Sequence, residues 1–221
     1  MSLNTRLSIG IAAAFALVVG VLLVVNATDS PGPSPASSSG GVAPDPRLVR
    51  PDSHRLSTAA DGKVTFVEFL DFECEACRAA YPAVEKLREQ YDGKVTFVVR
   101  YFPIESHFNA ERAARAVEAA AQQGKFEAMY KKMYESQGEW GEQQVAADGK
   151  FRAFAKGLGL DLAAFDKAYA DPATLARVKK DAEDGIAVGV RGTPSFFLNG
   201  QQIQPQSFED LTRLIDAELN R

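Results

Sequence analysis

Cysteine and histidine are scarce in this chain of 221 residues, which contains two of each. A structural zinc site needs four ligands, so Cys74 and Cys77 would have to be joined by His54 and His107. The spacing of these four residues fits no common zinc finger or ribbon. We therefore predict no metal site, and we expect no cofactor.

The chain also lacks a run of lysine and arginine. Its formal net charge is −4, and charges of both signs are mixed along the sequence. This pattern excludes the basic patch that nucleic-acid binding requires. The part from about Leu48 onward, about 170 residues, is long enough to bury most of its apolar surface without disulfide staples.

Only one long apolar run is present, from Ile9 to Val25. At about 17 residues it is at the lower limit for a helix that spans a bilayer. Arg6 precedes the run, which favours an N-terminus inside the cell. We predict an uncleaved single-pass anchor within residues 1–27, and a cleaved signal peptide followed by secretion is the alternative. Both interpretations place the rest of the chain outside the cytoplasm.

The segment after this run is rich in proline, serine, glycine and alanine. It lacks the apolar content needed to fold, so residues 28–55 are predicted to form a flexible linker. Residues 56–221 remain as the folded domain.

The folded part begins with a strand–helix–strand pattern. A β-branched and aromatic run covers residues 64–72, helical spacing follows as far as Asp92-Gly93, and a second strand is expected over residues 94–102. Such a βαβ unit predicts two parallel strands with a right-handed crossover.

The next part of the chain, residues 109–188, is almost wholly helical by pattern. Asp161 and Asp171 are predicted to cap two of its helices. Two short strands joined at Asn199-Gly200, a type I′ hairpin signal, and a final helix capped by Ser207 close the chain. The order β-α-β, helices, β-β-α predicts an α/β fold with a helical insertion at about residues 106–188.

Cys74 and Cys77 stand three positions apart, where the first strand gives way to a helix. A disulfide that closes so short a loop constrains little of the unfolded chain, so a structural role explains it poorly. Outside the cytoplasm a thiol pair can persist as a disulfide. We therefore predict a reversible dithiol/disulfide pair.

The helix start assigns different roles to the two sulfurs. Unpaired backbone N–H groups and the helix dipole favour the Cys74 thiolate, whereas Cys77 lies one turn further along and more deeply. Cys74 is then the sulfur that is attacked, and Cys77 resolves the mixed disulfide. Glu73 and Glu75 flank Cys74, and we expect both to be solvated. The pKa of Cys74 should therefore lie below that of free cysteine without being extremely low.

Glu68 lies six residues before Cys74, among apolar neighbours. Partial burial would raise its pKa and suit it to exchange a proton with Cys77. A strand-end glutamate that faces solvent is the alternative, and the residues alone leave the two open.

Three stretches together resemble the DsbA-like thioredoxin-fold thiol:disulfide oxidoreductases, in particular the membrane-anchored Gram-positive type. They are VTFVEFLDFECEACRAAYP, the helical insertion and GVRGTPSFFLNG, within residues 62–220. The resemblance implies a thioredoxin fold interrupted by an all-helical domain. It also implies that Cys74 and Cys77 are the redox pair, that Glu68 transfers protons, and that Pro82 kinks the active-site helix.

The same resemblance assigns a substrate site to Thr193-Pro194, where a cis-proline would pack beside the redox pair. This chain differs from the strongly oxidising members of the family between the two cysteines, where it has Glu75-Ala76 in place of Pro-His. Without that histidine one interaction with the thiolate is missing, so a weaker oxidant is expected. We assign His107 no role and expect a solvated loop residue.

These inferences predict an extracytoplasmic protein-disulfide oxidase at the cell membrane. Its partners would be reduced exported proteins, the membrane through the N-terminal helix, and a quinone-linked membrane protein of the DsbB-like or VKOR-like kind. A thiol-disulfide reductase or isomerase on the same fold is the alternative. A redox-independent chaperone or binding module is a third possibility.

Overall fold

A computed structural model describes residues 44–221 of the chain. The predicted anchor, residues 1–27, and the first part of the predicted linker lie outside the described residues. Within residues 44–221 no helix combines the length and the apolar character needed to cross a membrane.

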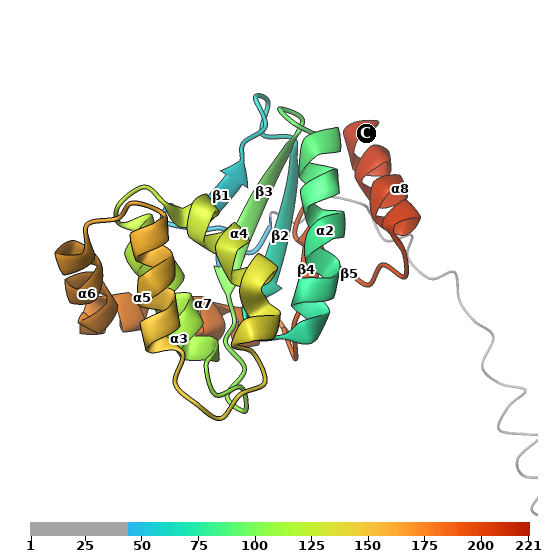
Figure 1. The fold of residues 1–221 in the computed structure, drawn as a ribbon. Helices are drawn as coiled ribbons and strands as arrows, with labels where there is room; N and C mark the ends of the chain where they lie inside the picture. The colour runs from blue at the N-terminus through green and yellow to red at the C-terminus, as the bar shows by residue number, and fades with distance from the viewer. Residues whose placement is uncertain (1–43) are drawn as a thin grey trace, which may run out of the picture. The chain divides into compact units, whose positions relative to one another are not determined.

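A five-stranded sheet forms the centre of the domain (Figure 1). Its strand order is β1-β3-β2-β4-β5, and only the central pair β2–β3 is parallel. The strands are β1 (His54–Ser57), β2 (Val64–Leu70), β3 (Val95–Tyr101), β4 (Ser195–Leu198) and β5 (Gln201–Ile203). The predicted βαβ unit is confirmed, because α2 (Glu75–Gln90) connects β2 to β3.

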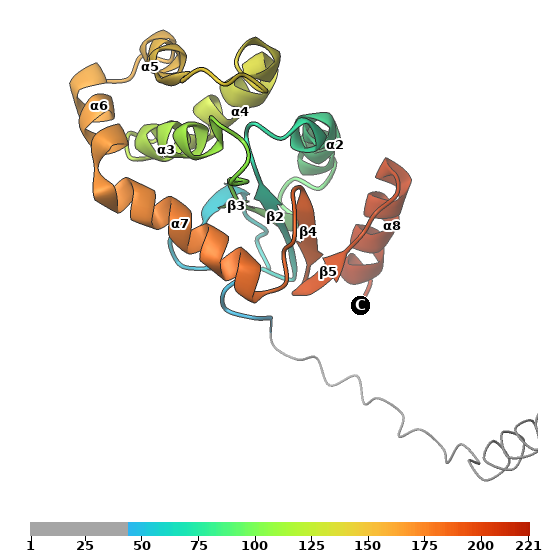
Figure 2. The ribbon, with the colours of Figure 1, turned by 90° about the horizontal axis from the view of Figure 1, so that it is seen from below.

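The alternation of side chains along β2 divides the core into two clusters. Phe66 and Leu70 belong to the larger cluster, which also includes buried side chains of α2 and of α8 (Phe208–Leu219). Val67 and Phe69 belong to the smaller cluster on the opposite face. Figure 2 shows α7 (Pro172–Ala187) along that opposite face.

Helix α7 approaches the sheet closely at Gly185, where a Cβ atom would lie only 2.7 Å from the Phe102 ring. Any other residue at position 185 would therefore have to displace an aromatic side chain or the helix itself.

The predicted helical insertion is confirmed between β3 and β4. Its helices are α3 (Ala110–Ala121), α4 (Phe126–Ser136), the 3₁₀ turn η1 (Gln137–Glu139), α5 (Asp148–Gly157), α6 (Leu162–Ala170) and α7. The predicted caps at Asp161, Asp171 and Ser207 are present, each accepting a hydrogen bond from a backbone N–H of its helix. Asn199 and Gly200 both have positive φ, as the predicted hairpin requires.

The linker prediction was wrong for residues 44–55, which are part of the folded domain. Leu48 is 2% exposed in the smaller cluster, and β1 begins at His54 and pairs with β3. The strand was missed because its four residues, His-Arg-Leu-Ser, carry little of the β-branched signal that marks a strand. Contacts with distant parts of the chain hold this segment, together with a few local hydrogen bonds.

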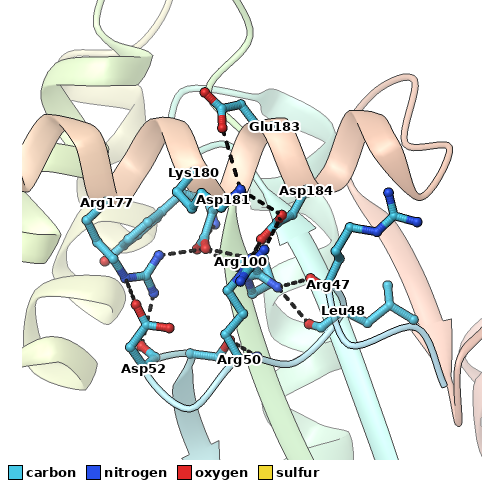
Figure 3. Close-up of polar contacts among 12 residues, drawn as sticks. Arg47, Leu48, Arg50, Asp52, Arg100, Arg177, Lys180, Asp181, Glu183 and Asp184 are labelled. Atoms are coloured by element: carbon cyan, nitrogen blue, oxygen red, sulfur yellow. Dashed lines mark hydrogen bonds and ion pairs between the residues drawn. The ribbon is translucent and has the colours of Figure 1, made fainter. Parts of the chain in front are cut away.

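Buried ion pairs attach the same segment to α7 (Figure 3). The Arg100 side chain of β3 is fully buried and pairs with Asp181 and Asp184 of α7, each at 2.7 Å. It also donates to the carbonyl oxygens of Arg47 and Leu48. Arg100 therefore joins the sheet, α7 and the N-terminal segment in one network.

Replacing Arg100 with methionine should lower the free energy of unfolding by about 3–5 kcal/mol, because two buried carboxylates lose a partner. Urea unfolding can be followed through the fluorescence of Trp140, the only tryptophan. Arg152→Met is the matched control, since Arg152 pairs with Asp166 at the surface and should cost less than about 1 kcal/mol. Equal losses in the two variants would contradict a stabilising role for the buried network.

Candidate redox site

Cys74 is the N-cap residue of α2, with extended backbone angles. The backbone N–H groups of the first turn are left without partners in the helix and lie near its sulfur. A hydrogen bond from the Cys77 thiol is the largest cause that lowers the pKa of Cys74, to about 5. Burial opposes this effect, and the backbone N–H groups of Cys77 and Ala76 add to it.

Cys77 lies one turn further along α2 and has no exposed surface, whereas Cys74 is 9% exposed. Burial, followed by the hydrogen bond to Cys74 and the charge of Glu68, raises the pKa of Cys77 well above its ordinary value. Both residues are free thiols in the structure. Cys77 is the deeper of the two sulfurs, as predicted, but Cys74 is itself largely buried rather than exposed. The roles of the two sulfurs in exchange stay predictions.

Glu68 lies beneath α2, with only 3% of its surface exposed. In the sheet it stands opposite Val99 of β3 and Phe196 of β4. Burial raises its pKa to about 8, and the charges of Glu85 and Cys74 contribute. Of the two alternatives that the sequence left open, the structure shows the buried glutamate and not the solvent-facing one. The role of Glu68 in proton transfer stays a prediction.

Thr193 and Pro194 lie next to Cys74, joined by a cis peptide bond. The Cys74 thiol donates to the Thr193 carbonyl oxygen at 3.4 Å. The Thr193 hydroxyl is buried and has no hydrogen-bond partner. Beside these residues a hollow of about 550 Å³ is lined also by Arg191, Ser195 and Gln204.

Residues 71–74, here called the redox loop, are fixed by the side chain of Asp71 within the loop and by that of Gln137 from the helical insertion. The Asp71 carboxylate accepts from the backbone N–H of Glu73 at 2.8 Å and of Ile104 at 2.9 Å. The amide of Gln137, from the helical insertion, donates to the carbonyl oxygens of Phe72 at 2.7 Å and Cys74 at 2.9 Å. Asp71 and Gln137 were not predicted, because hydrogen bonds to backbone atoms leave no pattern in the sequence.

Glu73 differs from the expectation that its side chain is solvated. It is 1% exposed rather than solvated, and its carboxylate accepts from the backbone N–H of Asn109 at 2.5 Å. Burial, the largest cause, raises its pKa, and the hydrogen bond from Asn109 opposes this. Glu75 is exposed, as expected.

His107 also differs from the expectation of a solvated loop residue. Instead of lying free in solvent, it pairs through Nδ1 with Asp71 at 2.6 Å, and its side chain is 25% exposed. The other histidine, His54, is part of β1 rather than of an unstructured approach. Within residues 44–221 no three His, Cys, Asp or Glu side chains are grouped so that they could hold a metal ion.

The family model described as thioredoxin matches residues 56–217 of this chain. The chain belongs to the thioredoxin family. A thioredoxin-like oxidoreductase from Silicibacter pomeroyi DSS-3 superposes with a TM-score of 0.67 and 27% sequence identity, over 81% of this chain and 99% of that one. Oxidised BdbD from Bacillus subtilis has the same TM-score at 21% identity, over 75% and 92% of the two chains.

α-DsbA1 from Wolbachia pipientis superposes with a TM-score of 0.70 at 18% identity, over 78% of this chain and 94% of that one. The predicted DsbA-like thioredoxin fold is thus confirmed. The predicted membrane-anchored type stays a prediction.

Curated relatives contain a domain similar to this thioredoxin domain within much longer chains. The Na(+)/H(+) antiporter NhaA 1 of Mycobacterium sp. (strain KMS) is 32% identical over 177 residues, which is 77% of this chain and 28% of the antiporter. NhaA 3 of Salinispora tropica is 34% identical over 169 residues, which is 76% and 25% of the two chains. This chain therefore spans about a quarter of the length of these relatives.

Alkylation of the reduced protein with iodoacetamide should follow the ionisation of Cys74, with a midpoint near pH 5. Cys77→Ala should raise that midpoint, because it removes the thiol that supplies the largest stabilising hydrogen bond. Cys74→Ser is the control and should abolish the rapid reaction. A midpoint near 8.5 in the wild type would contradict the assignment of Cys74 as the stabilised thiolate.

Glu68 should make stability depend on pH. Its pKa is about 8 in the folded chain and close to the ordinary glutamate value of 4.5 when unfolded, so the folded state binds the proton more tightly. Its contribution to the free energy of unfolding is therefore complete below about pH 4.5 and is lost as the pH rises to 8. Each unit of pKa difference corresponds to about 1.4 kcal/mol.

Glu68→Gln should flatten this dependence and stabilise the reduced protein at pH 8 more than at pH 5. Urea titrations at the two pH values measure the difference. The exposed Glu75→Gln is the matched control, and it should leave the dependence unchanged. A Glu68→Gln variant with the wild-type dependence would show that Glu68 is ionised in the folded protein near its ordinary pKa.

Proposed function

We propose that this protein is an extracytoplasmic thiol:disulfide oxidase that introduces disulfides into exported proteins. The observation that supports this most directly is the position of Cys74 at the N-cap of α2, with Cys77 one turn deeper and fully buried. This arrangement lowers the pKa of Cys74 to about 5 and raises that of Cys77. Interactions that stabilise a thiolate favour the reduced form of the pair. The disulfide form is then readily given up to a substrate.

The oxidation transfers two electrons in two exchange steps. A substrate thiolate attacks the Cys74 sulfur, the Cys74–Cys77 bond breaks, and Cys77 leaves and takes up a proton. A second substrate thiolate then attacks the substrate sulfur of the mixed disulfide and releases Cys74. The substrate gains a disulfide, and the pair becomes a dithiol.

Glu68 would supply the proton that Cys77 requires. Its pKa of about 8 would leave the carboxyl group mostly protonated near neutral pH. A buried acid of this kind can donate to a leaving thiolate without bulk water. In the reverse step it would take the proton back.

The substrate would lie in the hollow beside Thr193 and Pro194. The Thr193 carbonyl oxygen is already within hydrogen-bond distance of Cys74, so a segment held there brings its sulfur to the reacting atom. Proximity of this kind contributes much of the rate of such exchanges.

The remaining parts of the proposal rest on the sequence. Export through residues 9–25 would place the domain outside the cytoplasm, anchored to the membrane or released after cleavage. A quinone-linked membrane partner, DsbB-like or VKOR-like, would remove the two electrons and restore the disulfide.

A thiol-disulfide reductase or isomerase is the second candidate. Glu75 and Ala76 between the cysteines are both exposed and bring no positive charge to the thiolate. This would weaken the oxidant, and a membrane electron donor could then keep the pair reduced.

Mixing the oxidised protein with a reduced, unfolded disulfide protein should transfer one disulfide per molecule. Cys74→Ser should abolish the transfer. When Cys77→Ser is mixed with the disulfide form of the same substrate, its Cys74 thiolate should attack that disulfide, release one substrate thiol and accumulate a mixed disulfide, because the resolving sulfur is missing. Thiol trapping followed by mass spectrometry measures both outcomes.

The direction of electron flow in the cell is tested separately. Alkylation of exported protein under acid quench should find Cys74 and Cys77 mainly as a disulfide. A fully reduced pair would favour the reductase instead. A chaperone activity unchanged in Cys74→Ser would point to a redox-independent role.

A further inference from the structure

His107 lies in the loop between β3 and α3, next to the redox loop. Its Nδ1 atom is 2.6 Å from Oδ2 of Asp71, whose side chain is completely buried. Asp71 in turn carries the redox loop, since its carbonyl oxygen accepts from the backbone N–H of Cys74 at 3.3 Å. His107 is thus linked to the backbone of the reactive cysteine through a single residue, Asp71.

The Asp71 carboxyl group is completely buried in the segment that also holds the reactive Cys74. Burial raises its pKa, and the hydrogen bonds that it accepts from Ile104, Glu73 and His107 oppose this and favour its charged form. Two of these donors are the uncharged backbone N–H groups of Glu73 and Ile104. Among the described residues, His107 is the only cationic side chain that bonds to it. If His107 were uncharged, the carboxylate would repel the Cys74 thiolate in a low-dielectric setting.

The surroundings of His107 favour its charged form. Burial of the ring opposes the charge, but the hydrogen bond to Asp71 and the charges of Asp71, Cys74 and Glu73 outweigh it and raise the pKa of His107. The charged groups that most affect the pKa of His107 are thus Asp71, Cys74 and Glu73. The imidazolium therefore responds to the same thiolate that the proposed reaction creates.

We propose that His107 is a positioning residue that sets the reduction potential of the Cys74–Cys77 pair through Asp71. As an imidazolium it neutralises the buried carboxylate and so stabilises the Cys74 thiolate in the reduced form. It provides from another loop the positive charge that Glu75-Ala76 does not provide between the cysteines. This inference rests on one part of the proposed function, namely that Cys74 and Cys77 exchange their disulfide with other thiols.

The test is the equilibrium of the purified domain with glutathione. In it the protein disulfide and two glutathione thiols give the protein dithiol and one glutathione disulfide, so two electrons and two protons reach the protein. His107→Gln keeps a donor for Asp71 but removes the charge. We expect the equilibrium constant to fall about tenfold, which corresponds to a potential about 30 mV more negative.

A second variant separates charge from structure. In Asp71→Asn/His107→Gln both charges are absent, so the repulsion that the single variant exposes is removed as well. The equilibrium constant should return to within about threefold of the wild type. A merely structural role for His107 would instead make the double variant worse than the single one.

His54 is the matched control, because the chain has only two histidines. It pairs with Glu118 at 2.6 Å and stacks on Phe126, in an environment that includes neither cysteine. His54→Gln should lower the thermal stability, as His107→Gln should, yet leave the equilibrium constant unchanged.

Three results would overturn the inference: a His107→Gln constant within twofold of the wild type, a fall that the double variant does not reverse, or an equal fall in His54→Gln. A wild-type pair that did not equilibrate with glutathione at all would overturn the proposed function, and this inference with it.

Discussion

The position of two sulfurs at the start of one helix is the constraint on which the rest of the site depends. Cys74 precedes the first turn of α2 and lies near free backbone N–H groups, while Cys77 is one turn deeper and fully buried. The same thiol chemistry therefore produces one stabilised thiolate and one thiol. A change that moved the helix start would take Cys74 away from these N–H groups and reduce the contrast.

The helical insertion has a direct part in holding that position. Gln137 bonds to two carbonyl oxygens of the redox loop, and the backbone N–H of Asn109 bonds to Glu73. A thioredoxin domain is thus not merely interrupted by these helices, because they contribute contacts to its reactive loop. On the other face, Arg100 and α7 fix the N-terminal segment to the sheet.

The sequence predicted those features that have a local cause. Periodicity indicated β2, α2 and β3, and the spacing of Cys74 and Cys77 indicated the redox pair. It did not predict β1, the burial of Glu73 or the pairing of His107 with Asp71, because each depends on contacts between residues far apart in the chain. Glu68 is intermediate, since its apolar neighbours suggested burial but only the sheet on one side and α2 on the other complete it.

The reduction potential of the wild-type pair tests the central claim most directly. A pKa of about 5 for Cys74 lies between the values of about 7 in thioredoxin and about 3.5 in DsbA. We therefore predict a potential between those of the same two proteins, about −270 mV and about −120 mV. A value at or below about −270 mV would contradict the account, because the pair would then be a reductant rather than an oxidant.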